Sequence, residues 1–165
     1  MKAVDAFRRQ LDGAWSHKWE SLNAVLEGVT DAEAEWQAPC YAAEEREDGW
    51  PAPGTVRWQV AHVAHCKRYY TKFIRAPGVT ERPEADPRVL PRDFAAEMAA
   101  LRETHAAQRG ALAALSDADL GKPVGNGMGM AEFLAMAIRH DTWHAAQIAV
   151  ARRLYRASGG VDGGA

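Results

Sequence analysis

Two histidines, His140 and His144, stand four residues apart in a stretch whose apolar residues recur every three or four positions. That period is typical of a helix, so both imidazoles are expected on one face, together with the apolar side chains. Two imidazoles at this spacing can bind one metal ion, as they do in helical HExxH zinc sites. Position 141 is Asp where that motif has Glu, so the pattern favours a metal site over a metalloprotease.

Packing is the alternative interpretation of this pair. A single histidine on an apolar helical stripe is usually a hydrogen-bonded residue of the core or its boundary. Two histidines on the same face are harder to explain in this way, since each needs polar partners when it is buried. A third ligand elsewhere in the chain would favour the metal.

A further group of histidines lies in residues 56–75, which are predicted to form a helix with histidine on its inner stripe. His62 is the candidate for the third ligand. His65, one turn further on, is a candidate ligand, a hydrogen-bonding partner or a proton carrier. Cys66 stands four residues after His62 and could also be a ligand, but a single cysteine on a helix more often packs as a small buried hydrophobe.

Four amphipathic segments are predicted as helices, over residues 2–29, 56–75, 91–115 and 130–156. No alternating pattern indicates a strand, so the fold class is all-α and the architecture is a four-helix bundle. Inward side chains of facing helices build the metal sites of such bundles. Three neutral imidazoles, from His62, His140 and His144, would suit Zn, Ni or Fe as a divalent ion.

Two other features bear on the site. The segment 36–54 is rich in acidic residues, proline and glycine, and a loop of this length in a compact domain is often functional, so it could cover the open end of the site. His105 lies on the inner stripe of the third predicted helix. We interpret it as a packing residue at a helix boundary, because a helical stripe is first of all a packing surface.

The length and net charge of the chain narrow the range of functions that it could have. The 165 residues suit a single domain, assigned to residues 1–157, followed by a glycine-rich tail over 158–165 that is expected to be disordered. The net charge of −2 indicates no nucleic-acid partner, and no apolar run approaches the length of a membrane span. Two cysteines form no disulfide framework, and the first residues do not resemble a signal peptide, so a cytoplasmic location is expected.

Tryptophan is abundant, with six residues in this short chain. Trp36 and Trp50 fall near or within the long loop, and Trp15 or Trp19 falls near the edge of its helical stripe. Large apolar residues at a surface mark an interface or a ligand groove, so a homodimer is predicted. A monomer whose loop tryptophans close over the site is the alternative.

The two histidine blocks together resemble the DinB/YfiT-like family of metalloenzymes. The matching runs are Trp58-Gln-Val-Ala-His62-Val-Ala-His65 and His140-Asp-Thr-Trp-His144-Ala-Ala-Gln147-Ile. The resemblance covers nearly the whole chain and implies a four-helix bundle of unusual chain order, with a divalent metal held by His62, His140 and His144. The family often has an acidic residue shortly after its first histidine, where this chain has His65 and Lys67.

The resemblance also implies a reaction type, because the wider superfamily includes transferases and isomerases that use mycothiol or bacillithiol. A site of three histidines leaves a metal position open for catalysis. One expectation is metal-assisted hydrolysis, with His65 or Asp141 accepting the proton. The other is the transfer of a small thiol, which binds the metal as a thiolate. A non-enzymatic module that binds a metal or small ligand in a stress response is the alternative.

Overall fold

The computed structural model describes residues 2–19, 21–44, 49–85 and 93–160. These residues form six α-helices and two short 3-10 helices. In chain order they are α1 (Ala3–Ser16), α2 (Leu22–Leu26), α3 (Asp31–Glu35), η1 (Pro39–Tyr41), α4 (Val56–Arg75), α5 (Phe94–Ala113), η2 (Asp117–Gly121) and α6 (Met130–Ala157). No strand occurs in the described ranges, so the all-α prediction is confirmed. No helix in these ranges combines the length and apolar character needed to cross a membrane.

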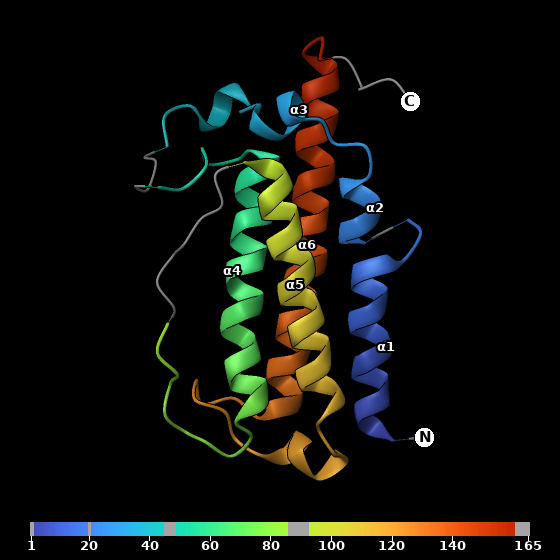
Figure 1. The fold of residues 1–165 in the computed structure, drawn as a ribbon, viewed down its shortest axis with the longest axis vertical. Helices are drawn as coiled ribbons and strands as arrows, with labels where there is room; N and C mark the ends of the chain where they lie inside the picture. The colour runs from blue at the N-terminus through green and yellow to red at the C-terminus, as the bar shows by residue number, and fades with distance from the viewer. Residues whose placement is uncertain (1, 20, 45–48, 86–92, 161–165) are drawn as a thin grey trace.

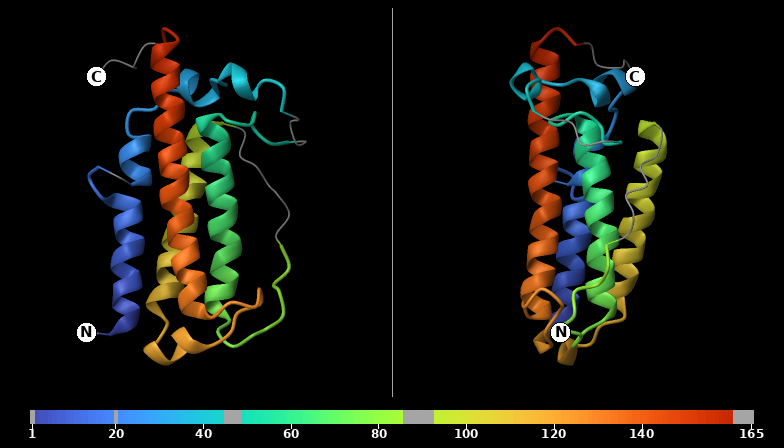
Figure 2. Two further views of the ribbon diagram at one scale, coloured as in Figure 1. Left: turned by 180° about the vertical axis from the view of Figure 1, so that it is seen from behind. Right: turned by 90° about the vertical axis from the view of Figure 1, so that its left-hand side faces the viewer.

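The long helices form a four-helix bundle, in which α2 continues the direction of α1 (Figure 1). Helix α4 packs against α5 and α6, and α1 packs against the same two helices, so α1 and α4 are diagonally opposed. Helices α4 and α5 run in the same direction, while α1 and α6 run in the opposite one, as the two further views show (Figure 2). Consecutive helices α4 and α5 are therefore parallel neighbours.

The prediction of one continuous helix over residues 2–29 is wrong, because the structure has two helices there, α1 and α2. The Ser21 hydroxyl accepts a hydrogen bond from the Ala24 amide and begins α2 as an N-cap. Such a cap offers the backbone an alternative to a continuous helix. The apolar spacing continues across the break, so periodicity alone did not reveal it. Trp19 lies in the break and is 73% exposed.

Side-chain caps also begin α3, α4 and α5. Thr30 and Thr55 accept hydrogen bonds from the amides of Glu33 and Trp58, respectively. Helix α5 is capped by Asp93, whereas Pro91, the predicted start of this helix, lies outside the described residues.

The last helix ends in a hydrogen-bonded turn. The amides of Ser158 and Gly160 both donate to the Tyr155 carbonyl, so residues 158–160 close the end of α6 in a turn. The remaining residues of the predicted tail, 161–165, lie outside the described ranges.

A polar layer separates the interior into two apolar halves. One cluster lies where α4 begins and α6 ends, and includes Val60 and Ile148. The other lies at the opposite ends of these helices, and includes Phe73 and Phe133. Between them α4, α5 and α6 bury polar side chains, namely Lys67, Thr104, His105, Gln108, Asp141 and His144. Burial of a polar group costs stability unless the group is hydrogen-bonded. A layer with this many buried polar side chains is therefore a candidate functional site.

Candidate metal centre

Three imidazoles from two facing helices converge beside this polar layer. The Nε2 atom of His140 lies 3.3 Å from Nε2 of His62 on α4 and 3.2 Å from Nε2 of His144 on α6. The ring centroids of His62 and His144 are 4.8 Å apart. The helical spacing places His140 and His144 on one face, as predicted from the sequence, and the packing of α4 against α6 brings His62 opposite them.

A cysteine joins this cluster. The Sγ atom of Cys66 lies 3.4 Å from Nε2 of His62. The candidate ligand atoms of His62, Cys66 and His140 all lie within 4.8 Å of one another. The sequence interpretation favoured a packing role for Cys66, although its spacing from His62 equals that of His144 from His140 and could have indicated a second pair of ligands.

The spacing of these atoms fits a tetrahedral metal ion. Two nitrogens bound at about 2.05 Å to one zinc ion lie roughly 3.3 Å apart, from the ideal tetrahedral angle. The measured separations from His140 to His62 and to His144 agree with this value. An imidazole nitrogen is also a normal ligand for zinc, nickel and iron. These two separations therefore fit a divalent ion that His62, His140 and His144 would hold, although His144 is outside the group of His62, Cys66 and His140 whose ligand atoms all lie within 4.8 Å of one another.

Burial keeps His140 and His144 neutral. It lowers the pKa of His140 to about 4, and the neighbouring His62 and Lys67 lower it further. It also lowers the pKa of His144 to about 3, with His140 and His62 as the next contributions. Neutral imidazole, unlike imidazolium, has a lone pair available for a metal. Near pH 7 His140 and His144 are therefore in the protonation state that binds a cation.

Neighbouring side chains orient two of the rings. The Nδ1 atom of His144 is 2.5 Å from Oε1 of Gln59 on α4, a contact in which Nδ1–H donates and Nε2 keeps its lone pair. Trp58 stacks on His62 with ring centroids 4.9 Å apart and an interplanar angle of 8°. Nδ1 of His140 is buried and has no hydrogen-bond partner within the described part of the chain. Sequence reasoning did not identify Gln59, because its role depends on the contact between helices.

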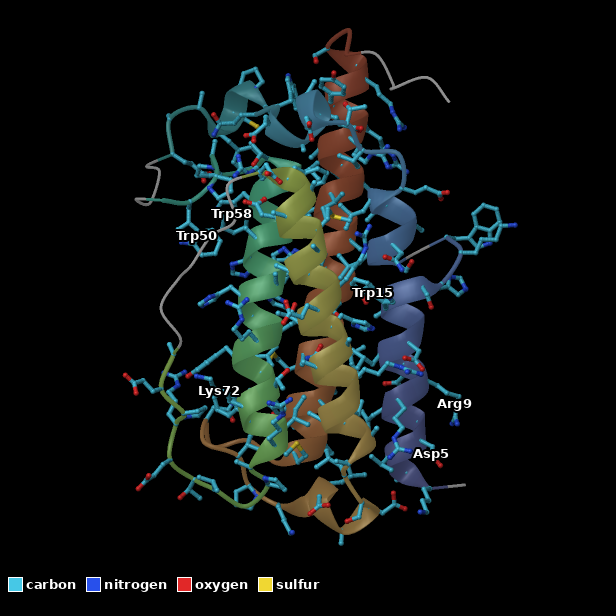
Figure 3. The ribbon with its side chains drawn as sticks, in the orientation of Figure 1. Asp5, Arg9, Trp15, Trp50, Trp58 and Lys72 are labelled. Carbon is cyan, nitrogen blue, oxygen red and sulfur yellow. The ribbon has the colours of Figure 1, made fainter. Side chains whose placement is uncertain are left out.

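The two residues predicted to be catalytic lie in different surroundings. His65 is half-buried on α4 and its ring lies 6.1 Å from that of the buried Trp50. Figure 3 shows Trp50 beside Trp58 near the start of α4. The surface position expected for Trp50 is therefore wrong, because it packs against Trp58, His62 and His65. His65 lies on the aromatic side of the cluster, one turn from His62.

Asp141, in contrast, points into the bundle. Its carboxylate forms a fully buried ion pair with Lys67 of α4, and the Lys67 ammonium donates a second bond of 2.9 Å to Oε1 of Gln108 on α5. Burial raises the pKa of Asp141 and lowers that of Lys67, while the pair opposes both shifts. An Asp141 carboxylate committed to Lys67 cannot also face a substrate proton. The sequence did not reveal this pairing, although Gln108 was on the predicted inner stripe.

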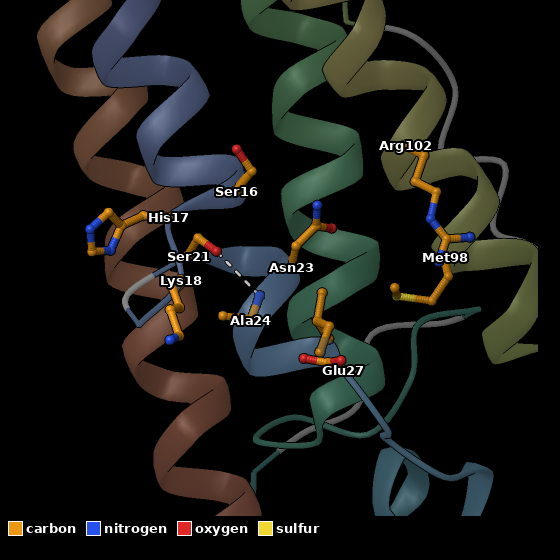
Figure 4. A pocket seen from close by; sticks show the side chains of 10 residues that line it. Ser16, His17, Lys18, Ser21, Asn23, Ala24, Glu27, Met98 and Arg102 are labelled. Carbon is orange, nitrogen blue, oxygen red and sulfur yellow. Dashed lines mark hydrogen bonds between the residues drawn. The ribbon is translucent and has the colours of Figure 1, made fainter.

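Two of the hollows at the bundle surface bear on the site. One of about 290 Å³ is lined by Gln59, the hydrogen-bond partner of His144, and by Trp143, Gln147 and Val150, among others. Another of about 400 Å³ lies at the break between α1 and α2, with Lys18, Glu27 and Arg102 in its lining (Figure 4). Neither lining includes His62, His140 or His144, so volume alone does not locate the chemistry.

Together, an all-α bundle and a buried histidine cluster between two of its helices define a helical protein with a candidate metal centre. The sequence matches the DinB superfamily over residues 14–148, most of the chain, and the protein belongs to this superfamily. Comparison with curated proteins gives no match, and comparison with solved structures gives none either. The resemblance inferred from the histidine blocks is thus confirmed at the level of the family.

Proposed function

We propose that the protein is a metal-dependent enzyme that activates a small nucleophile, either water for hydrolysis or a low-molecular-weight thiol for S-transfer. The observation that carries this proposal is that the Nε2 atoms of His62 and His144 both lie within 3.3 Å of Nε2 of His140, between α4 and α6. A divalent ion held there would act as a Lewis acid and lower the pKa of a bound water or thiol towards about 7.

The chain's own residues would perform the remaining steps. Gln59 holds the ring of His144 so that its Nε2 lone pair faces the other two histidines. Trp50 and Trp58 form an aromatic wall beside His62, which excludes water from that side. His65 stands against this wall, and we assign to it the acceptance of the proton from the nucleophile. Asp141, the other predicted acceptor, is assigned instead to holding Lys67 and thereby the relative position of α4 and α6.

Metal content tests the proposal directly. Wild type is expected to contain about one equivalent of zinc, nickel or iron, and His144→Ala should lose most of it because one of three ligands is missing. His65→Ala should retain the metal and lose turnover in a screen of small thiols with electrophiles and of activated esters. Equal metal content in wild type and His144→Ala would refute the site, and metal loss in His65→Ala would make His65 a ligand.

A further inference from the structure

The position of Cys66 gives the cluster a feature that three histidines do not have. Cys66 follows His62 by one helical turn, in the same way that His144 follows His140 on the facing helix. Each helix thus contributes a pair of donor atoms at the same spacing. The Cys66 sulfur belongs to neither apolar cluster of the described core, and it lies against ring nitrogens of the site.

The distance from the Cys66 sulfur to Nε2 of His62 also fits coordination of both atoms to one metal ion. A thiolate sulfur about 2.3 Å from a tetrahedral zinc ion and an imidazole nitrogen about 2.05 Å from it would lie roughly 3.6 Å apart. The measured separation from Cys66 Sγ to His62 Nε2 is 3.4 Å. Cys66 does more than fill space, because its sulfur contacts Nε2 of His62 and is also a hydrogen-bond partner of Tyr70.

We propose that Cys66 is a ligand of the same ion, so that the protein supplies three imidazole nitrogens and one thiolate. This inference rests on the proposed metal site. Binding breaks the S–H bond, the proton passes to solvent, and the sulfur electron pair forms the bond to the ion. A thiolate favours zinc, cobalt or nickel over harder ions such as magnesium or manganese. Four protein ligands fill a tetrahedral site, so the nucleophile of the proposed function would bind as a fifth ligand, a coordination number that catalytic zinc sites can reach.

Cobalt(II) spectroscopy tests this inference because a thiolate bound to cobalt gives a near-ultraviolet charge-transfer band that imidazole ligands lack. The matched pair of variants is Cys40→Ser, which retains Cys66, and Cys66→Ser, which retains the exposed Cys40. The band is expected in wild type and Cys40→Ser and should be absent in Cys66→Ser. Cys66→Ser should also bind cobalt more weakly, by at least the roughly 10–100-fold that loss of an outer-sphere partner costs.

Alkylation provides a second measurement that does not require Cys66→Ser to fold. In Cys40→Ser, zinc should slow the reaction of Cys66 with iodoacetamide, as followed by mass spectrometry, because coordination withdraws electron density from the sulfur and shields it from the reagent. The Cys40 thiol of wild type should react at the same rate with and without zinc.

The outcomes separate the two proposals. Wild type that binds no cobalt would overturn the metal site itself, and the inference with it. Stoichiometric cobalt without the charge-transfer band, together with no zinc protection of Cys66, would overturn the role of Cys66 and leave the three-histidine site intact. A band that persists in Cys66→Ser would also overturn it.

Discussion

His105 occupies a buried environment away from the metal centre, at the interface of α5 with α1. Its ring stacks on Trp15, with centroids 4.0 Å apart and an interplanar angle of 9°. Burial lowers the pKa of His105 to about 3, and the charges of Lys67 and Arg109 lower it further, while Asp12 opposes the shift. His105 is therefore a neutral packing residue, and its protonation is coupled to folding.

The protonation of His105 predicts a loss of stability in acid. The unfolded chain takes up this proton near pH 6.5, whereas the folded chain resists it until about pH 3. The contribution of His105 is thus complete above pH 6.5 and is lost as the pH falls towards 3, with a limiting slope of about 1.4 kcal/mol per pH unit. Urea unfolding at pH 7.5 and pH 5 should show a larger fall for wild type than for His105→Phe. Parallel falls would contradict the assignment.

The site residues differ in how far sequence could predict them. Helical periodicity predicted that His62, His140 and His144 lie on inner faces, because the spacing of residues along a helix determines which side chains share a face. Gln59 and the ion pair of Lys67 with Asp141 depend on which turn of α4 meets which turn of α6. This alignment of the two helices is set by tertiary packing. The apolar periodicity of a single helix does not predict it.

At the level of elements, the buried pair of Lys67 and Asp141 joins α4 to α6, and Gln108 adds α5 to the same network. Lys67 directly follows Cys66 in the sequence, and Asp141 directly follows His140. A single network thus ties together three helices immediately next to the residues that would hold the metal. A buried ion pair is poor evidence for net stability, and its better-attested use is to fix the relative position of elements.

Removal of one partner should therefore be costly. Lys67→Met leaves the Asp141 carboxylate buried and unpaired, and it is expected to lower the free energy of unfolding by about 3–5 kcal/mol. The double variant Lys67→Met with Asp141→Leu should recover much of this loss in urea unfolding. Arg109→Ala, which breaks the exposed ion pair with Asp12, is the control and should have a much smaller effect. A single variant as stable as this control would contradict a buried pair.

The helices themselves were predicted to different degrees. Residues 56–75 were predicted as the structure has them, since Thr55 caps the start and the Pro77–Gly78 turn follows the end. The break between α1 and α2 was missed, because the apolar spacing continues through it and the Ser21 cap is a weak local signal. Periodicity predicts that a segment is helical more reliably than it predicts where the helix stops.

At the level of the molecule, the two apolar clusters give the bundle a core on both sides of the proposed metal centre. Removal of metal should therefore leave the helices intact, unlike the unfolding of a zinc finger. Addition of a chelator is expected to preserve the far-ultraviolet circular dichroism signal and to lower the melting temperature. Loss of the helical signal would show that the ion is needed for the fold.

Assembly is the second prediction at this scale. Trp143, Val150 and Leu154 form an exposed apolar stripe along α6, with Trp143 65% exposed. Such a stripe on a helix face suits self-association through a two-fold axis, and the homodimer stays a prediction on this basis rather than on the buried Trp50. Light scattering should give about twice the chain mass of 18.1 kDa, and Trp143→Glu should shift it towards one chain. A single-chain mass for wild type would count against the dimer.

The stacking of Trp58 on His62 gives the protein an optical reporter of its own metal centre. Indole emission responds to charge placed close to the ring, and a cation on His62 would lie closer to Trp58, whose ring centroid is 4.9 Å from that of His62, than to Trp50 at 6.3 Å. The fluorescence difference between wild type and Trp58→Phe would therefore follow occupancy of the centre in real time, without a dye or an added chromophore. A titration of metal into the purified protein could then be followed by its intrinsic tryptophan fluorescence.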